Sequence, residues 1–356
     1  MSESSSTHPT VPSSYEAENQ DGPETKKTVR QNRISATMLS IMERQVHQLR
    51  RELVDFFLLA GDPKLTNSQR SMLPPFVDVI VFGPSGSGKS SLIRTFYRAL
   101  HNTSVLPRDL SERVVVQDTL RNEGTTQYVK AVIKQREQDT DGRPTSSGII
   151  LHDTRGQIWM DRKEQQQLDV IIQGRIKDDV TVEQRDRRYA RLLWEFWRSE
   201  ADLFPPEILN KRSGLATRPH ALIFVFDGSM DEIPNGEEET DFYREVISMA
   251  RRKGYYYPQI VLTRIDKVEQ QLPQDVSQAE AEVILRQRLD SKIEAVVLNL
   301  GVSRSSVHFI ENYHADGMCQ DLSIDFHALR VLHECVQHGD TFIRSAMKNR
   351  PRCVIQ

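Results

Sequence analysis

The sequence predicts an α/β fold in three layers, in which a mostly parallel sheet lies between helices on both faces. Apolar runs of strand length, at 221–226 and 259–263, alternate with longer amphipathic segments at 238–252 and 279–300. Strands that alternate with helices pair in parallel, because each crossover helix returns the chain to the end of the sheet where it started. The 356 residues, 38% of them hydrophobic, suffice for a core in one large or two ordinary domains.

Two segments precede the predicted sheet. Residues 1–33 are rich in Ser, Thr, Pro and Glu and carry few large apolar side chains, so we expect a disordered tail. Within 34–62, apolar residues recur at three- and four-residue spacing, which predicts a helix packed on the domain that follows. A helix that binds a partner or a second copy is the alternative. The domain itself is predicted over 63–348, and 349–356 form a C-terminal tail.

The stretch Gly83–Ser90 is the strongest motif of the chain. It reads G-x-x-x-x-G-K-S and stands between the apolar run 76–82 and the helical segment 91–97. In this context the glycines let successive N–H groups point at phosphate oxygens, and the helix N-terminus adds partial positive charge. The lysine neutralises the β- and γ-phosphates, and the serine hydroxyl ligates Mg²⁺. The motif predicts the three-layer P-loop NTPase fold and a nucleotide site made by Gly83, Pro84, Ser85, Gly86, Ser87, Gly88, Lys89, Ser90 and Ser91.

Further segments complete the predicted sheet and its cover. Strands are expected over 128–136 and 148–152, and the turn signal at 141–144 between them indicates an antiparallel hairpin at the edge of the sheet. A strand at 307–310 and a closing helix at 326–348 end the domain.

A D-x-x-G motif, Asp153–Gly156, follows the second strand of this hairpin. In isolation the pattern is a common turn, but its place behind an apolar strand of a P-loop protein gives it a function. There the aspartate, Asp153, holds Mg²⁺ through water, and the Gly156 N–H meets the γ-phosphate.

Residues 157–218 form a long, highly charged insertion, in which we expect mainly helices. We expect Trp194 and Trp197 to pack onto the domain and the charges to form a solvated face. A surface for a protein partner is the alternative for this insertion.

A second set of residues predicts recognition of the base. Thr263, Arg264 and Asp266 follow an apolar strand and fit the pattern [N/T]-K-x-D, with Arg in place of Lys. The aspartate accepts two hydrogen bonds from guanine, and adenine does not offer these donors, so a carboxylate here discriminates strongly. The aliphatic stem of Arg264 can still lie over the base. Asn312 and Tyr313 follow the last strand, where a loop that closes over the base is expected.

In this order the motifs resemble the small G domain of Ras-like GTPases over residues 76–345. The resemblance implies that Gln157, directly after D-x-x-G, orients the attacking water. It also implies a switch threonine that reaches Mg²⁺, at Thr125 or Thr126. We take Thr125 as the metal ligand, together with Ser90 and Asp153.

A closer resemblance is to the interferon-induced protein 44 family. It is carried by Arg218–Asp227, by the segments that begin at Gly301 and end at Tyr313, and by the helix from Asp325 to Ile343. The long piece after D-x-x-G is also similar. The family has GTPase-like motifs and is associated with innate antiviral responses, whereas Arg264 and Gln157 depart from its pattern.

Composition bounds the class of protein. The net charge of −3 does not favour a broad nucleic-acid surface, so no nucleic-acid partner is expected. Three cysteines are too few for a disulfide framework and suit a reducing compartment. No apolar run is long enough to cross a membrane, and the N-terminus has no secretory pattern. We therefore expect a cytoplasmic protein.

The chain ends in Cys353-Val354-Ile355-Gln356, a C-a-a-X pattern whose final Gln is typical of farnesylation. Lys348, Arg350 and Arg352 would supply the second, electrostatic signal for membrane contact, because a single prenyl chain binds only marginally. An accidental ending is the alternative. With the lipid, the protein would lie at the cytosolic face of a membrane.

Two functions fit these motifs. The first is a GTPase switch that hydrolyses GTP to GDP with Mg²⁺, using Lys89, the metal and loop N–H groups against the charge of the phosphoryl group. The second is an interaction module that holds GTP or GDP with little or no hydrolysis. A nucleotide kinase ranks lower, because it has no need of Asp266 behind a strand.

Overall fold

The computed structural model describes residues 36–59, 65–66, 69–70, 72–116, 127–154, 156–181, 203–273, 275–314 and 319–348. Contacts divide the chain into two units, residues 1–43 and 44–356. The described part of the first unit is the beginning of helix α2 (Ala36–Val54). The predicted tails, 1–33 and 349–356, lie outside the described residues, as do Thr125, Thr126 and Cys353.

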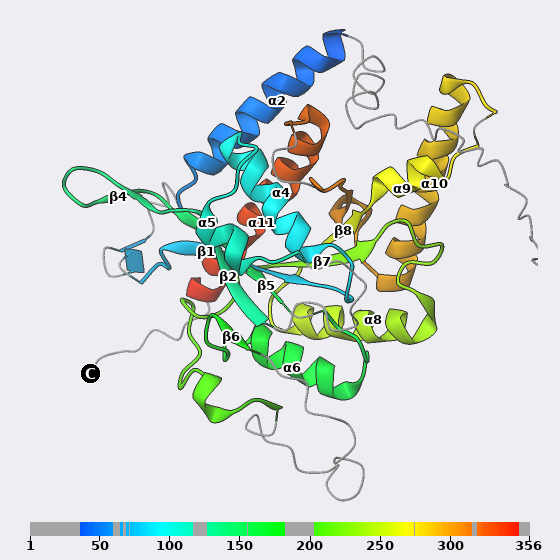
Figure 1. The fold of residues 1–356 in the computed structure, drawn as a ribbon. Helices are drawn as coiled ribbons and strands as arrows, with labels where there is room; N and C mark the ends of the chain where they lie inside the picture. Colours follow the sequence, from blue (N-terminus) through cyan, green and yellow to red (C-terminus); the bar gives the residue numbers. More distant parts are fainter. Residues whose placement is uncertain are drawn as a thin grey trace, which may run out of the picture. The chain divides into compact units, whose positions relative to one another are not determined.

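The second unit is built around a sheet with the strand order β6-β2-β5-β1-β7-β8-β9 (Figure 1). Strands β1, β5, β7, β8 and β9 run parallel, β2 is antiparallel to β5, and β6 is antiparallel to β2. The bounds are β1 (Phe76–Phe82), β2 (Gln127–Lys134), β5 (Gly148–Asp153), β6 (Val180–Thr181), β7 (Ala221–Asp227), β8 (Gln259–Thr263) and β9 (Val307–Phe309). A short ribbon, β3 (Glu137–Gln138) and β4 (Pro144–Ser146), extends the predicted hairpin.

Helices cover both faces of this sheet. On one face α4 (Lys89–His101) packs against α11 (Leu322–Lys348), and on the other α6 (Arg162–Ile172) packs against α8 (Gly236–Arg252) (Figure 1). The other helices whose bounds the structure describes are α5 (Arg108–Arg113), α9 (Ile265–Gln270), α10 (Gln278–Leu300) and the 3-10 turns η2 (Pro206–Ile208) and η3 (Arg304–Ser306). This is the three-layer P-loop NTPase fold that the sequence predicts. Among the described helices, none combines the length and the apolar character that a membrane span requires.

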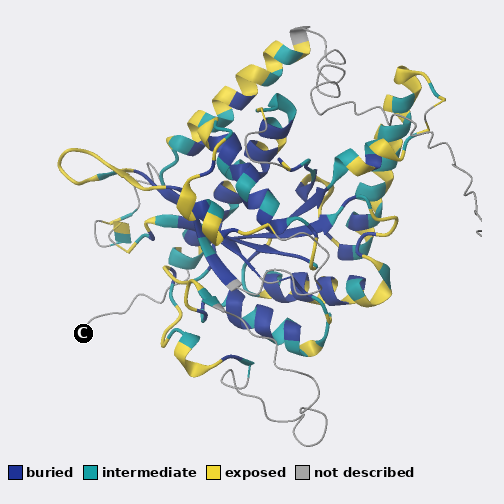
Figure 2. Cartoon of the chain, in the orientation of Figure 1, coloured by how far each residue is buried: buried dark blue, intermediate teal, exposed yellow. Residues whose placement is uncertain are grey.

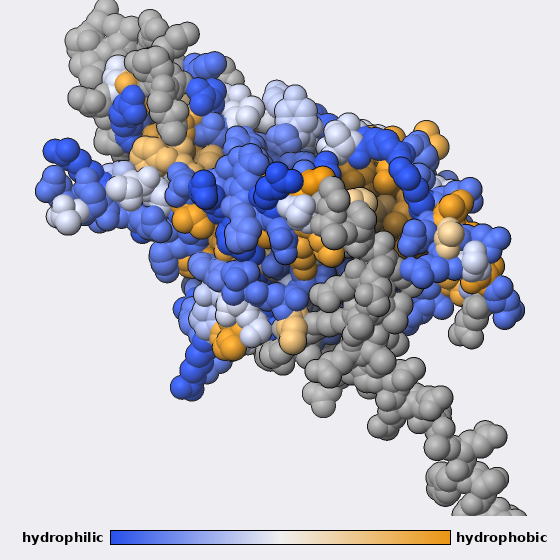
Figure 3. Space-filling model, turned by 90° about the horizontal axis from the view of Figure 1, so that it is seen from above, coloured by the Kyte–Doolittle hydropathy of each residue, from blue (hydrophilic) through white to orange (hydrophobic). Residues whose placement is uncertain are grey.

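The buried residues gather in the central strands (Figure 2). All six residues of β5 are buried, and so are the last four of β1, because parallel strands covered on both faces meet no solvent. The face of the molecule drawn in Figure 3 carries mostly hydrophilic residues, with hydrophobic residues in separate groups between them.

Local signals set the ends of the longest helices. The Ser277 side chain accepts from the Glu280 N–H while the Glu280 carboxylate accepts from the Ser277 N–H, which starts α10 with a capping box. Gly301, with φ 63°, ends the same helix in the left-handed conformation that glycine adopts without strain. The sequence prediction of 279–300 therefore comes close to the observed bounds.

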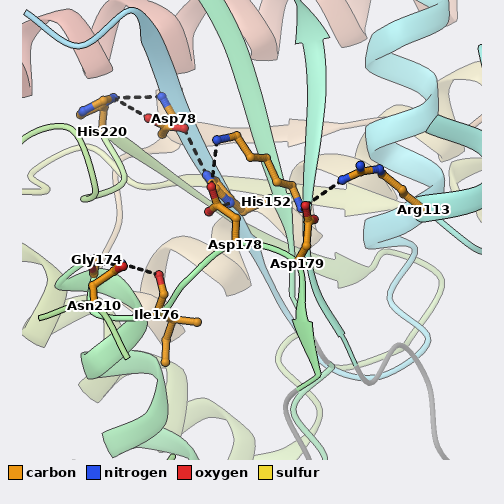
Figure 4. A network of polar contacts seen from close by, with 10 residues as sticks. Asp78, Arg113, His152, Gly174, Ile176, Asp178, Asp179, Asn210 and His220 are labelled. Carbon is orange, nitrogen blue, oxygen red and sulfur yellow. Dashed lines mark hydrogen bonds and ion pairs between the residues drawn. The ribbon is translucent and has the colours of Figure 1, made fainter. Parts of the chain in front are cut away.

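Only part of the insertion after D-x-x-G is described, so its mainly helical character stays a prediction. Helix α6 spans 162–172, and the other described residues of the insertion include the strand β6, the turn η2 and an antiparallel bridge between Ile176 and Leu209. Residues 182–202, with Trp194 and Trp197, lie outside the described part. Polar contacts explain the extended course of the described part, because the Asn210 side chain donates to the carbonyls of Gly174 and Ile176 (Figure 4).

Buried polar groups tie this insertion to the sheet. Asp78 of β1 lies 3.2 Å from His152 of β5, and the Asp78 N–H donates to Nδ1 of His220 at 2.9 Å (Figure 4). The His220 Nε2–H donates to the Leu215 carbonyl at 2.8 Å. Burial lowers the pKa of His220, so the ring is held neutral in this arrangement. On the other side, Asp178 pairs with Lys130 at 2.8 Å.

Candidate nucleotide-binding site

The phosphate loop occupies the place where open α/β sheets bind ligands. It leaves the carboxyl end of β1, which lies between β5 and β7, so the chain crosses from one side of β1 to the other at this point. At Gly83, φ is 148°, and a Cβ there would lie 2.1 Å from the Val225 carbonyl oxygen of β7. Only glycine fits a backbone that passes so close to its neighbour.

Lys89 lies beneath this loop and is 5% exposed. Its ammonium donates to the carbonyls of Gly83 at 2.9 Å and Pro84 at 2.8 Å. Burial lowers the pKa of Lys89 to about 8, and the nearby charge of Asp153 opposes that shift. A phosphate anion would stabilise the charged form further, because it adds negative charge in the same buried place.

Asp153 and Ser90 form the second buried pair of the site. The Ser90 hydroxyl donates to Asp153 Oδ2 at 2.6 Å, and Asp153 is fully buried at the end of β5. Burial raises the pKa of Asp153 to about 6, against the Ser90 hydrogen bond and the charges of Lys89 and Arg94. Its other oxygen, Oδ1, is buried and has no hydrogen-bond partner in the described part of the chain. A buried carboxylate oxygen next to a hydroxyl fits the hard oxygen ligation of Mg²⁺.

The D-x-x-G loop lies directly against the phosphate loop. A Cβ at Gly156 would be 2.5 Å from the Cα of Ser85. The Gln157 N–H donates to the Gly83 carbonyl at 3.2 Å, and the Ser85 N–H donates to the Gln157 carbonyl at 3.1 Å. Between these bonds, Pro84 and Gln157 form a parallel bridge that joins the two loops.

The Gln157 side chain, predicted to orient water, has structural contacts here. It is 5% exposed, and its Oε1 accepts from the Gly83 N–H at 2.9 Å and from the Tyr243 hydroxyl at 3.2 Å. The sequence analysis missed Tyr243, because nothing in the pattern of α8 marks one buried aromatic residue as a partner of D-x-x-G. To face an attacking water, the Gln157 amide oxygen would have to leave both donors.

Thr263 and Arg264 hold the other side of the loop. The Thr263 hydroxyl lies 2.7 Å from the Ser87 carbonyl, and the Arg264 guanidinium donates to the Gly86 carbonyl at 2.7 Å. Arg264 also pairs with Asp227 at the end of β7. Sequence reasoning missed Asp227, although its position directly after a buried strand was a usable signal. Arg264, which stands where the motif usually has Lys, therefore still contacts the phosphate loop.

Asp266 lies in the first turn of α9. Its Oδ1 is buried and lacks a hydrogen-bond partner among the described residues, and its Oδ2 is 3.7 Å from Nε2 of His314. A buried acceptor left without a donor is costly in a folded protein unless a ligand completes it. A ligand with N–H donors, as on the Watson–Crick edge of guanine, fits this oxygen.

Asn312 and Tyr313 take different roles in the loop after β9. The Asn312 side chain donates to the Gly88 carbonyl at 3.3 Å, so it lies beside the phosphate loop. Tyr313 points into the protein: it is 5% exposed, its N–H donates to the Thr95 hydroxyl at 3.1 Å, and its OH donates to Asp325 at 2.8 Å. Its backbone N–H is therefore bonded within the protein, to Thr95.

Together these residues form a phosphate loop and its surroundings, which make a candidate nucleotide-binding site on a P-loop NTPase fold. No protein-family model matches the chain, and no curated protein matches it either. The resemblance to the interferon-induced protein 44 family therefore stays a prediction.

Solved structures give a distant likeness. The chain is similar to Toc33 from Arabidopsis thaliana in complex with Mg²⁺ and GMPPNP, at 12% identity and a TM-score of 0.39, over 85% of this chain and 93% of that one. It is also similar to the S. cerevisiae Ski7 GTPase-like domain bound to GTP, at 13% identity and TM-score 0.37, over 76% of this chain and 52% of that one. For the bacterial selenocysteine-specific elongation factor EF-Sec the values are 13% and 0.30, with 76% and 29% covered.

Lys89→Ala should abolish nucleotide binding. We expect a loss of at least about 100-fold in affinity, because charge-assisted hydrogen bonds to two phosphates are removed. Calorimetry with GDP and Mg²⁺ measures the effect, and the thermal midpoint without ligand checks that the fold is kept. Lys211→Ala, at an exposed lysine outside the site, is the matched control. Micromolar binding retained by Lys89→Ala would refute the assignment of the phosphate loop.

Proposed function

We propose that the chain binds guanine nucleotides with Mg²⁺ and hydrolyses GTP to GDP as a switch. The observation that carries the base preference is Asp266 Oδ1, a buried carboxylate oxygen with no partner in the described structure. It belongs to the same short segment as Arg264, which is hydrogen-bonded to the phosphate loop. A base bound at Asp266 and phosphates bound in the loop would thus contact the same hydrogen-bonded segment of the chain.

Each end of the nucleotide has its own set of residues in this proposal. The loop N–H groups, the N-terminus of α4 and Lys89 bind the phosphates. Ser90 and Asp153 would hold Mg²⁺, which supplies positive charge against the negative charge of the transferring phosphoryl group. The threonine that completes this set, Thr125 in our prediction, is outside the described residues.

Asp266 would distinguish guanine from adenine by its hydrogen bonds. Guanine presents a ring N–H and an amino group side by side, and the carboxylate accepts both. Adenine has an acceptor at the ring position, so the buried carboxylate would be left without its partner. A site built to hydrogen-bond rejects such an analogue strongly.

The second candidate is a nucleotide-binding interaction module with little or no hydrolysis. One observation favours it, namely the pair of hydrogen bonds that hold the Gln157 amide oxygen on Gly83 and Tyr243. If Gln157 keeps these contacts with GTP bound, it cannot orient water. A protein partner would then bind a surface of the insertion 157–218.

The cellular place of the chain remains a proposal from the sequence. We propose farnesylation of Cys353 and peripheral attachment at the cytosolic face of a membrane, supported by the C-a-a-X pattern and the upstream basic residues. A part in innate immune responses follows only from the family resemblance.

Asp266→Asn should shift the preference from guanine to xanthine nucleotides. Xanthine carries a carbonyl where guanine carries its amino group, so an amide that donates there fits where a carboxylate does not. We expect GDP affinity to fall at least about 100-fold and that of xanthosine diphosphate to rise. Asp275→Asn, at an exposed aspartate, is the control. If Asp266→Asn binds GDP as the unaltered protein does, Asp266 does not read the base.

Gln157→Leu separates the two candidate functions in a single-turnover hydrolysis experiment. If Gln157 orients water, we expect the rate to fall about 100-fold, as for other losses of positioning. Tyr243→Phe removes only the hydroxyl that contacts Gln157 and should leave the rate equal or higher. GDP affinity is measured for each variant, because Gln157 also contacts Gly83. Equal, negligible rates in all three proteins would support the interaction module.

Cys353→Ser should abolish lipid incorporation. We expect the unaltered protein, expressed in eukaryotic cells, to gain the mass of one farnesyl group and to sediment partly with membranes. The variant should stay at its sequence mass and in the supernatant. An unmodified Cys353 in the unaltered protein would show that the ending is accidental.

A further inference from the structure

A chain of buried and partly buried polar contacts connects helix α2 with the phosphate loop. It begins in the second unit at Arg50, which is on the part of α2 whose Val46 and Leu53 are buried in the core. The Arg50 Nε–H donates to the Ala99 carbonyl of α4 at 2.9 Å, and its Nη2–H donates to Asp325 Oδ2 of α11 at 3.3 Å. One guanidinium thus joins the two helices that cover this face of the sheet.

Asp325 also contacts the loop after β9. Its Oδ1 accepts from the Tyr313 hydroxyl at 2.8 Å. Asp325 is 3% exposed, and burial raises the pKa of this carboxyl while Tyr313 and Arg50 lower it. A buried carboxylate is costly unless it is paired, so each partner supports the charged form. Removal of Arg50 would leave Tyr313 bonded to a carboxylate that has lost its cation.

The last steps reach the phosphate loop. The Tyr313 N–H donates to Thr95 Oγ1 at 3.1 Å, and this fully buried hydroxyl is also 3.3 Å from the Asn312 side-chain oxygen. The Asn312 amide in turn donates to the Gly88 carbonyl at 3.3 Å. The next residue, His314, lies 3.7 Å from Asp266. The segment 312–314 therefore contacts both the phosphate loop and the base-reading carboxylate.

We propose that Arg50 is a positioning residue for the nucleotide: through Asp325 and Tyr313, it fixes the loop 312–314 that flanks the bound base. This inference rests on the proposed function, and it adds that helix α2 regulates the rate at which the nucleotide is released. Arg50 and Asp325 lie outside the candidate site, and they act by holding Tyr313. Displacement of the 44–54 segment of α2 therefore accelerates nucleotide release.

Nucleotide dissociation from the full chain tests this proposal. A fluorescent GDP analogue is displaced by excess GDP in Mg²⁺, and the dissociation rate is compared with the association rate and with the thermal midpoint of each protein. We expect Arg50→Ala and Tyr313→Phe each to raise the dissociation rate about 5-fold or more, within the usual range of coupling between sites. Association should change little, because the phosphate contacts remain. Arg50→Lys keeps the charge beside Asp325 and should rescue part of the effect.

A double-mutant cycle distinguishes a relay, in which Arg50 acts on the nucleotide through Tyr313, from two independent losses of stability. If the residues act in one chain, Arg50→Ala with Tyr313→Phe dissociates no faster than the faster single variant, whereas independent effects multiply. Arg51→Ala, at the exposed neighbour on the same helix, should keep the rate of the unaltered protein. If Arg50→Ala does not fold, Arg50→Lys and Tyr313→Phe complete the test.

Two results would overturn the inference. One is an unchanged dissociation rate in Tyr313→Phe and in the folded Arg50 variants, and the other is multiplication of the two effects. Both presuppose that the unaltered protein binds GDP, so they refute the relay and leave the proposed function standing. Absence of GDP binding by the unaltered protein refutes the proposed function first.

Discussion

The site depends on the hydrogen bonds that hold the carbonyl groups of the phosphate loop. Lys89 binds those of Gly83 and Pro84, Arg264 that of Gly86, Thr263 that of Ser87, and Asn312 that of Gly88. In a planar trans peptide the N–H points opposite to the carbonyl of the preceding residue. Holding the carbonyls of Ser87 and Gly88 from outside therefore turns the N–H groups of Gly88 and Lys89 to the other side, where a phosphate can accept them.

These bonds come from segments far apart in the sequence, which explains why the sheet order matters. The segment after β8 supplies Thr263 and Arg264, and the segment after β9 supplies Asn312. Because β7, β8 and β9 run parallel to β1 in the same sheet, their carboxyl ends lie at the same edge as the loop. Asp227 at the end of β7 then fixes Arg264 by an ion pair. The base side and the phosphate side of the site are thus parts of one hydrogen-bonded structure.

Burial of charge gives the site its chemistry. Lys89 and Asp153 are both buried. Burial lowers the pKa of Lys89 and raises the pKa of Asp153, so it favours the neutral form of each side chain. Such a pair is costly in the absence of a ligand, and a phosphate with a divalent cation would stabilise both charges. Asp153 Oδ1 and Asp266 Oδ1, both without a partner in the described structure, lie where the proposed site would hold the metal and the base.

Much of this was predictable from local patterns. The strand–loop–helix of Phe76–His101 and the strands β7 and β8 follow from apolar runs and glycines, which act over short distances. The course of residues 173–181 and 203–218 was not predictable, because it depends on contacts such as Asn210 with Gly174, which no local period records. The same holds for Gln157. Its position after D-x-x-G predicted that it orients the attacking water, but its contact with Tyr243 of α8 arises only in the folded protein. Tyr313 was expected beside the base, and its burial follows from Asp325, which is on another element.

Calorimetric titration of the unaltered protein with GDP, GTP and ATP in Mg²⁺ decides whether Asp266 reads the base. We expect GDP and GTP to bind with one-to-one stoichiometry and ATP at least about 100-fold more weakly, because Asp266 accepts only the guanine donors. Equal or tighter binding of ATP would contradict this expectation. Thr263–Asp266 would then be a support of the phosphate loop without a part in reading the base.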